Sequence, residues 1–125
     1  MSEASLTGLR ILLVEDEAMV AMIIEDTLRD LGCEVVGPIA SIERAREAAI
    51  SERVDGAFLD VNLRGELVYP VAEVLAARNV PFAFVTGYGE SGIDPRFRGA
   101  PVLAKPFLPE TVEQLVSRHM ARRAA

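Results

Sequence analysis

The sequence predicts an α/β protein built on a doubly wound, five-stranded parallel sheet. Three observations lead to this fold class: short apolar runs alternate with amphipathic stretches, the alternation repeats five times, and no long linker interrupts it. Such alternation is typical of a parallel sheet that carries helices on both faces. Right-handed crossovers then favour the strand order 2-1-3-4-5 of flavodoxin-like (βα)5 folds.

The five expected strands are short runs rich in Val, Ile, Leu and Phe. Runs of this kind are typical of strands that a parallel sheet buries on both faces. They cover residues 9–14, 34–37, 56–59, 80–85 and 101–104.

Amphipathic stretches between these runs predict the helices. Ser41 can cap a second helix, a third apolar face lies within residues 68–75, and Pro109 suits the first turn of a last helix. In the first helix, apolar residues recur every three or four positions and stop before Gly32, a natural C-terminal cap: Val20, Ile23, Ile24, Leu28 and Leu31.

The segment after the fourth expected strand differs from the other connections. Residues 90–99 contain two glycines and one proline, which disfavour a regular helix. We therefore expect the fourth helix to be short or mobile.

Length, charge and cysteine content narrow the function classes. A chain of 125 residues predicts a single domain over residues 1–125, with its core at about residues 9–120. The net charge of -6 argues against direct binding of nucleic acid or of anionic membranes, because both require a positive field. No apolar run is long enough for a membrane span, and a single cysteine excludes a multi-cysteine metal site. We expect a cytoplasmic protein.

Polar residues stand where the expected strands end. Glu15 and Asp16 follow the first strand, Asp60 the third, Thr86 the fourth and Lys105 the fifth. In an open parallel sheet, ligands bind beyond the carboxyl ends of the strands, at the point where the strand order reverses. We therefore expect these five side chains to meet at one edge of the sheet.

Clustered carboxylates raise one another's pKa unless a cation lies between them. Oxygen ligands select a hard ion, and Mg²⁺ takes one or two carboxylates in addition to water and phosphate oxygens. Glu15, Asp16 and Asp60 are therefore predicted metal ligands, and the backbone carbonyl of Asn62 is a further candidate.

The same residues suit phosphoryl transfer. A carboxylate can act as a covalent nucleophile toward phosphorus, which is the role predicted for Asp60. Transfer depends on neutralising charge on the phosphoryl oxygens. Mg²⁺, the Lys105 ammonium and the Thr86 hydroxyl can each take one oxygen.

At this point the chain resembles the receiver domains of response regulators in two-component signalling, from residue 9 to about residue 120. Four short motifs, in this order and spacing, carry the resemblance: Val14-Glu15-Asp16, Phe58-Leu59-Asp60, Val85-Thr86-Gly87 and Ala104-Lys105-Pro106-Phe107.

The resemblance implies a role for each polar residue. Asp60 would be the phosphoacceptor, Glu15 and Asp16 the acid pocket, Thr86 the switch hydroxyl, and Lys105 the contact to the phosphoryl group. It also implies a cis peptide bond before Pro106.

Two positions depart from the common receiver pattern. Val102 stands where most receivers have an aromatic switch residue, and residues 62–66 replace the usual Pro-Gly turn after the phosphoacceptor. The usual coupling between threonine and that aromatic residue therefore cannot operate in this chain.

Residues 81–89 instead resemble a subfamily of stand-alone receivers with a Phe-Ala-Thr-Gly-x-Tyr type motif, although Val85 and the early Tyr88 depart from it. That subfamily also lacks the strand-five aromatic residue. We therefore predict that Tyr88 and residues 89–99 take over the switching role, becoming ordered when Thr86 captures the phosphoryl group.

The sequence thus predicts a Mg²⁺-dependent phosphoacceptor that receives its phosphoryl group from a sensor histidine kinase or a phosphotransfer protein. It would signal to a protein partner or pass the group onward, and it would catalyse only its own phosphorylation and dephosphorylation. The alternatives are a metal-dependent phosphatase with an aspartyl nucleophile and a flavodoxin-like binding module. Asn62 disfavours the phosphatase, because it stands two residues after Asp60, where such enzymes have an acid that protonates the leaving group. Glu15 and Asp16 after the first strand disfavour the binding module, because an anionic cofactor would be repelled there.

Overall fold

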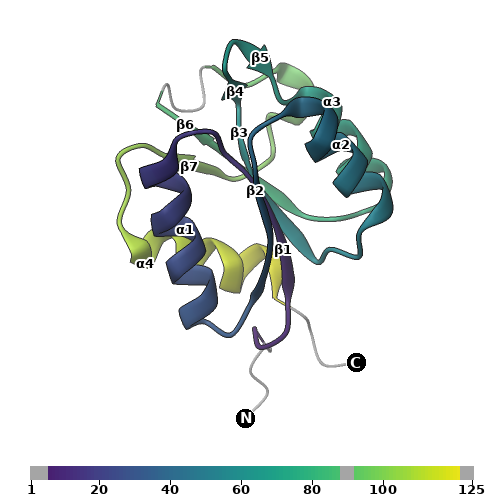
Figure 1. Cartoon of the computed structure of the whole chain (residues 1–125). Helices are drawn as coiled ribbons and strands as arrows, with labels where there is room; N and C mark the ends of the chain where they lie inside the picture. The colour runs from purple at the N-terminus through teal and green to yellow at the C-terminus, as the bar shows by residue number, and fades with distance from the viewer. Residues whose placement is uncertain (1–5, 88–91, 122–125) are drawn as a thin grey trace.

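The computed structural model describes residues 6–87 and 92–121. Five parallel strands form one sheet in the order β2-β1-β3-β6-β7 (Figure 1). This is the predicted order, because β6 and β7 are the fourth and fifth of the expected strands. The strands of this sheet are β1 (Arg10–Val14), β2 (Glu34–Ile39), β3 (Gly56–Asp60), β6 (Phe82–Thr86) and β7 (Val102–Ala104).

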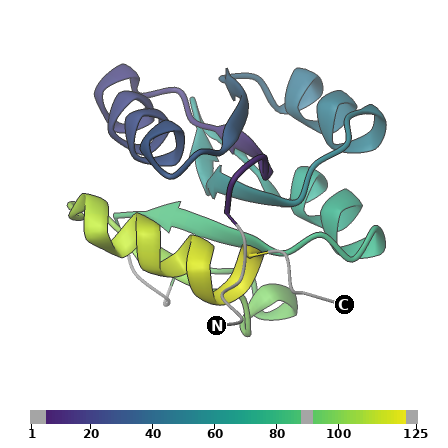
Figure 2. The same ribbon diagram turned by 90° about the horizontal axis from the view of Figure 1, so that it is seen from below.

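Helices cover both faces of the sheet, as Figure 2 shows. Side chains that alternate along β1 point to opposite faces: Ile11 and Leu13 pack with α1 and α4, and Leu12 and Val14 pack on the side of α2 and α3. All four are fully buried, which explains the continuous apolar run in the sequence. The helices are α1 (Ala18–Asp30), α2 (Ile42–Ser51), α3 (Tyr69–Ala77) and α4 (Pro109–Leu115).

A short hairpin that the sequence did not predict follows β3. Its strands are β4 (Asn62–Leu63) and β5 (Glu66–Leu67). The backbone of Arg64 and Gly65 has φ values of 52° and 91°, and Gly65 N–H donates to Asn62 Oδ1 at 2.7 Å. Two residues with positive φ are typical of a tight hairpin turn. The hairpin contains residues 62–66, which stand in place of the Pro-Gly turn.

The described part of the connection between β6 and β7, residues 87 and 92–101, contains the short 3-10 helix η2 (Pro95–Phe97), which agrees with the predicted short fourth helix. Asp94 caps it by accepting a hydrogen bond from Arg96 N–H at 2.9 Å. Phe97 packs against the rings of Tyr69, Phe82 and Phe84.

The last helix changes its hydrogen-bonding pattern near its end. After α4 the chain continues as a π-helical turn over Val116–Met120, where an uninterrupted α-helix was expected. Met120 is buried, and its side chain packs so closely on Gly56 that a Cβ at that glycine would lie 2.7 Å from Met120 Sδ. The turn therefore seats Met120 on the start of β3.

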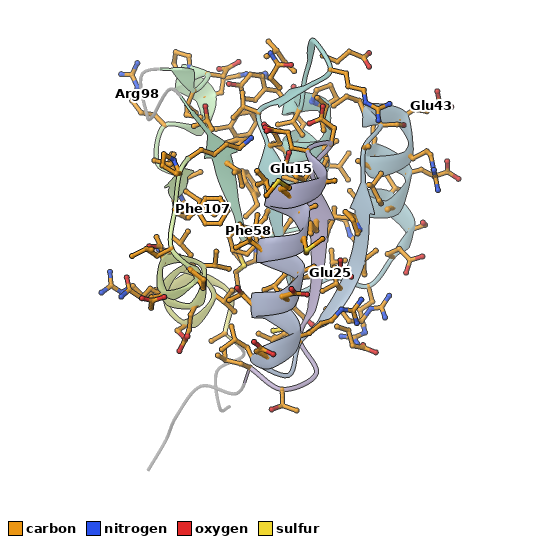
Figure 3. The ribbon with its side chains drawn as sticks, turned by 60° about the vertical axis from the view of Figure 1, so that its left-hand side comes forward. Glu15, Glu25, Glu43, Phe58, Arg98 and Phe107 are labelled. Carbon is orange, nitrogen blue, oxygen red and sulfur yellow. The ribbon has the colours of Figure 1, made fainter. Side chains whose placement is uncertain are left out.

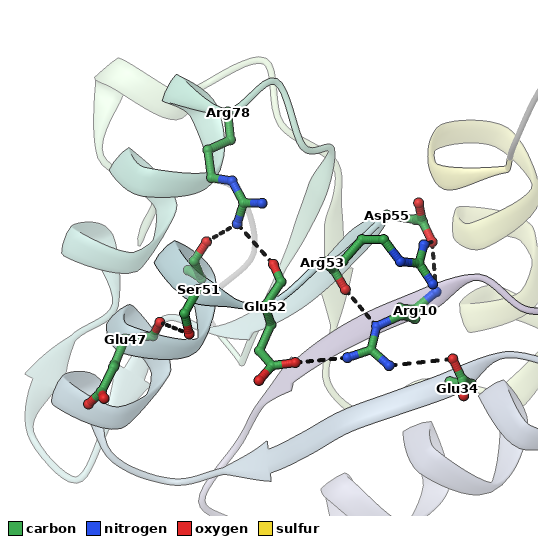
Figure 4. Close-up of polar contacts among 9 residues, drawn as sticks. Arg10, Glu34, Glu47, Ser51, Glu52, Arg53, Asp55 and Arg78 are labelled. Atoms are coloured by element: carbon green, nitrogen blue, oxygen red, sulfur yellow. Dashed lines mark hydrogen bonds and ion pairs between the residues drawn. The ribbon is translucent and has the colours of Figure 1, made fainter.

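The opposite end of the sheet from the predicted site is held by an ion-pair network (Figure 4). The Arg10 guanidinium donates to Glu52 Oε1 at 2.8 Å and to the carbonyl oxygen of Arg53 at 2.7 Å. Asp55 accepts from Arg10 N–H at 2.8 Å, and Arg78 donates to the carbonyl oxygen of Glu52 at 3.1 Å. The network joins β1 to the α2–β3 and α3–β6 connections.

The single cysteine, Cys33, is 6% exposed and its thiol lies 3.5 Å from the carbonyl oxygen of Leu6. Burial, with a smaller contribution from Asp55, raises the pKa of this thiol above its ordinary value. Among the residues that the structure describes, no helix combines the length and apolar character needed to cross a membrane.

Candidate functional site

The acids that follow β1 meet the acid at the end of β3. Glu15 and Asp60 are 2% and 4% exposed, and Asp16 is half-buried. One carboxylate oxygen from each of the three lies within 4.8 Å of the others. Figure 3 shows Glu15 at the upper end of the sheet, with the core residue Phe58 below it. The parallel pairing of β1 with β3 brings the acids together, because both strands end at the same edge.

Backbone groups orient two of these carboxylates. Glu15 Oε2 accepts a hydrogen bond from Glu17 N–H at 3.0 Å, and Asp60 Oδ1 accepts one from Asn62 N–H at 3.2 Å. Glu15 N–H in turn donates to the carbonyl oxygen of Ile39 at 3.0 Å, which ties the acidic loop to β2. Both side chains are therefore fixed by local backbone geometry.

Glu15, Asp16 and Asp60, the acidic trio, lie too close together and too deep for all three carboxyl groups to ionise readily. Burial, together with the interaction with Asp60, raises the pKa of Glu15 to about 8. Burial also raises the pKa of Asp60, against the lowering effects of Glu15, Lys105 and the Asn62 backbone. Buried carboxylates in contact cannot all carry charge unless a cation compensates them.

The residues present fit such a cation. Glu15 Oε1 and Asp16 Oδ1 are buried, and no described group forms a hydrogen bond with either. Unpaired buried oxygens are costly in a folded protein unless a ligand or ion satisfies them. A set of ligands made only of oxygen atoms, with several carboxylates, suits Mg²⁺ better than a softer metal.

Lys105 lies beside the acidic trio, directly after β7. Its Nζ is 3.5 Å from Asp60 Oδ2 and 3.7 Å from Glu15 Oε1. Its shortest contact with an acid is to Glu17 Oε1, at 2.5 Å. Burial lowers the pKa of the Lys105 ammonium, but Glu17, Glu15 and Asp60 raise it by more, so that the net shift is upward. The ammonium is therefore charged where it faces the acids.

Thr86 lines a cavity that Asp60 and Lys105 also line. It ends β6, is 4% exposed, and accepts at its carbonyl oxygen a hydrogen bond from Lys105 N–H at 2.9 Å. The cavity has a volume of about 570 Å³. Four of the predicted residues and part of the hairpin line it, whereas Glu15 and Asp16 do not. The lining residues are Glu17, Asp60, Val61, Asn62, Leu67, Thr86, Gly87, Gly92 and Lys105.

The remaining predicted positions have mixed outcomes. The Lys105–Pro106 peptide bond is cis, as predicted, and a second cis bond that was not foreseen precedes Pro38. Tyr88 lies outside the residues that the structure describes. Asn62 lines the cavity, and metal ligation by its carbonyl oxygen remains a prediction.

Sequence reasoning missed Glu17. It was attributed to the start of the first helix, and it does hold the N-cap position of α1, but its side chain forms no cap hydrogen bond. The carboxylate binds Lys105 instead. The only signal in the sequence was a third acid directly after the pair Glu15 and Asp16.

Comparisons with known structures decide the family. The chain is 45% identical to SdrG from Sphingomonas melonis Fr1, with 86% of this chain and 92% of SdrG covered at a TM-score of 0.77. It is 28% identical to the receiver domain of the sensor histidine kinase PA1611 from Pseudomonas aeruginosa PAO1, with 91% and 98% covered at a TM-score of 0.76. The chain belongs to the receiver domains of response regulators.

The family supplies the general role of this receiver, which is that of a phosphoacceptor in two-component signalling. Receivers are signalling proteins rather than enzymes that turn over a substrate. The PA1611 receiver has a magnesium ion coordinated in its active-site cleft, and here the acidic trio offers the corresponding kind of ligand.

The chain spans about half the length of the curated relatives it matches. It is 28% identical over 108 residues to the transcriptional regulatory protein PdtaR of Mycobacterium tuberculosis, covering 86% of this chain and 53% of PdtaR. No protein-family model matches the receiver.

Proposed function

We propose that Asp60 is the residue phosphorylated in this receiver, and that a phosphohistidine on a sensor histidine kinase or a phosphotransfer protein is the donor. The observation that carries the proposal is the pairing of the acidic trio, two of whose members are buried, with a lysine whose Nζ is 3.5 Å from Asp60. Glu15, Asp16 and Asp60 would hold Mg²⁺, with the carbonyl oxygen of Asn62 as a further ligand.

The chemistry follows from this geometry. An oxygen of the Asp60 carboxylate attacks phosphorus, the bond between phosphorus and the donor imidazole nitrogen breaks, and the imidazole leaves with the electron pair. When bound, Mg²⁺ supplies positive charge to the carboxylates and to one phosphoryl oxygen. Lys105 neutralises a second oxygen, and the Thr86 hydroxyl donates to the third.

Thr86 then acts as the switch. It lies at the cavity wall between Asp60 and the segment that leads to η2, so a hydrogen bond from its hydroxyl to the phosphoryl group would move the end of β6. Tyr88 would take over the switching role, because no aromatic residue stands at Val102 to couple to the threonine, and the packed segment around η2 would shift with it.

The cycle ends when water attacks the acyl phosphate and releases inorganic phosphate from Asp60. The receiver itself would catalyse this step, like the forward transfer, with the same residues. Between the two steps it would signal through a protein partner or pass the phosphoryl group to another carrier. We further propose that residues 1–125 form one cytoplasmic receiver domain, with its core at about residues 9–120, that acts without direct contact to nucleic acid or membrane.

Two alternatives receive less support from the site. An aspartyl phosphatase needs an acid that protonates the leaving group, and Asn62 occupies the position two residues after Asp60 where such an acid would stand. A flavodoxin-like module binds anionic cofactors, whereas the loop after β1 carries acids.

The test compares Asp60→Asn with the unchanged protein. We expect acetyl phosphate and Mg²⁺, or a phosphorylated kinase, to label the unchanged receiver and to leave the variant unlabelled, while circular dichroism shows the same fold. Asp26→Asn, which changes an exposed residue of α1, is the matched control and should be labelled normally. Full labelling of Asp60→Asn would assign the phosphoryl group to another residue, and sustained hydrolysis of a generic phosphoester would favour the phosphatase.

A further inference from the structure

The shortest contact of the Lys105 ammonium is to Glu17, a residue outside the acidic trio. Nζ lies 2.5 Å from Glu17 Oε1, compared with 3.5 Å to Asp60 and 3.7 Å to Glu15. The lysine side chain is 20% exposed and that of Glu17 is 59% exposed, so the pair sits at the rim of the cavity. The ammonium therefore lies nearer to Glu17 than to the two buried acids, both of which it still contacts.

The position of the ammonium matters because a lysine, like a metal ion, can neutralise carboxylates. An ammonium that paired fully with Asp60 and Glu15 would neutralise two of the three acids that hold Mg²⁺ and would compete with the ion. Asp60 and Glu15 are the other two carboxylates that contact Nζ among the described residues. Without Glu17, they are the partners to which the flexible lysine would turn.

We propose that Glu17 is a positioning residue that holds the Lys105 ammonium at the rim, where it can meet a phosphoryl group without competing with Mg²⁺ for Asp60 and Glu15. This inference rests on the proposed function, in which Lys105 contacts the phosphoryl group. It assigns Glu17 a role distinct from that of a metal ligand and from that of a helix cap. The side chain makes no cap hydrogen bond in α1.

The test is a double-mutant cycle on Mg²⁺ affinity, measured by titration in the absence of any phosphoryl donor. Glu17→Gln removes the carboxylate. Glu17→Ser removes it as well and supplies a favourable N-cap side chain, so α1 is not weakened. Each variant is made in the Lys105 background and in a Lys105→Met background. Thermal unfolding without Mg²⁺ establishes that all variants fold.

We expect both Glu17 variants to weaken Mg²⁺ binding by roughly threefold to tenfold when Lys105 is present, and by less than about twofold in Lys105→Met. Glu43→Gln is the matched control, because it removes the same charge from the first turn of α2, well away from Glu15 in Figure 3. Equal losses in the two backgrounds, no loss, or tighter binding would each overturn the inference.

Failure of the proposed function gives a different result. Beryllofluoride, a phosphoryl mimic, should bind Lys105→Met more weakly than the unchanged receiver if Lys105 contacts the phosphoryl group. Unchanged beryllofluoride binding in Lys105→Met would show that Lys105 does not contact the phosphoryl group, against the proposed function. If that binding is weakened, but the Glu17 substitutions reduce Mg²⁺ affinity equally with and without Lys105, only the role of Glu17 is rejected.

Discussion

The rings of Tyr69 and Phe97 stack, with 5.7 Å between their centroids and 7° between their planes. Tyr69 begins α3, directly after the hairpin that follows Asp60, whereas Phe97 ends η2. The Tyr69 hydroxyl donates to the carbonyl oxygen of Gly92 at 3.2 Å and accepts from Asp94 N–H at 2.9 Å. Tyr69 thus links the element after Asp60 to the segment after Thr86.

We predict that Tyr69→Phe loosens this link without disturbing the core. The ring contacts remain, but the two hydrogen bonds are lost, at a cost of about 1–2 kcal/mol in the free energy of unfolding. Amide hydrogen exchange at Asp94 should accelerate more than exchange in β1. Tyr69→Leu, which also removes the ring stack, should cost more than Tyr69→Phe. Unchanged exchange at Asp94 in Tyr69→Phe would show that the hydroxyl does not hold the segment.

Mg²⁺ affinity should rise with pH. The pKa of Glu15 is about 8 when no metal is bound, so Mg²⁺ must displace a proton from this residue at neutral pH. We expect the affinity to increase between pH 6 and pH 8 by up to about tenfold per pH unit for each proton displaced, and then to level off. Titrations in Glu15→Gln should have a flatter pH profile. A flat profile in the unchanged receiver would contradict the raised pKa.

The stability of the metal-free protein should change in the opposite direction. The pKa of Glu15 is raised in the folded state above its ordinary value of 4.5, so the folded protein binds more protons than the unfolded chain between these values. The free energy of unfolding contributed by this group is fully present below pH 4.5 and is lost as the pH rises through about 8. Urea unfolding in EDTA should show this decline from pH 6 to pH 8.5, and excess Mg²⁺ should remove it. A rise in stability over that range in EDTA would refute it.

Thr86→Ala should separate phosphorylation from switching. The substitution removes the hydroxyl, but it leaves Lys105 and the acidic trio, which includes Asp60, in place. We expect Asp60 to be labelled by acetyl phosphate, while the chemical-shift changes that beryllofluoride induces in residues 92–99 fall by more than half. Thr86→Ser keeps the hydroxyl and should retain most of the change. Equal responses in the alanine and serine variants would exclude the hydroxyl as the switch.

Gly56→Ala should destabilise the receiver through the last helix. A Cβ at this position would lie 2.7 Å from Met120 Sδ, so the Met120 side chain, the π-helical turn or β3 must shift. Overpacking of this kind costs about 1–3 kcal/mol in the free energy of unfolding. Gly99→Ala is the matched control, since no heavy atom lies within 4 Å of its added Cβ. Denaturant unfolding measures the free energy of unfolding of both variants. An unchanged value for Gly56→Ala would show that the Met120 side chain can move aside at little cost.

The order of strands and helices was predictable because each strand is buried on both faces and each helix has one apolar face. Leu12 and Leu13 are both fully buried, which a continuous apolar run indicates directly. Ile23 shows the limit of such patterns: it lies on the predicted inner face of α1 and is 40% exposed, whereas Ala21 and Thr27 are buried. Small and weakly apolar residues contribute little to periodicity.

The missed features depend on backbone geometry and on contacts distant in sequence. The hairpin turn uses Arg64 and Gly65 at positive φ, where an Asn-Gly pair would have been the recognisable signal. The π-helical turn ends at Met120, whose side chain packs against Gly56, a residue far away in the sequence. The pairing of Glu17 with Lys105 joins residues 88 positions apart, so no local pattern could indicate it.

The inaccessible thiol of Cys33 makes this chain convenient for spectroscopy. Because it is the only cysteine and has a raised pKa, maleimide reagents at neutral pH will modify it slowly. A cysteine introduced at Glu66, on the exposed side of the hairpin beside the cavity, could then carry a single fluorophore. The fluorescence of such a labelled protein could follow the binding of Mg²⁺ or beryllofluoride, and the hydrolysis of the proposed acyl phosphate, in real time. The natural cysteine would not have to be removed.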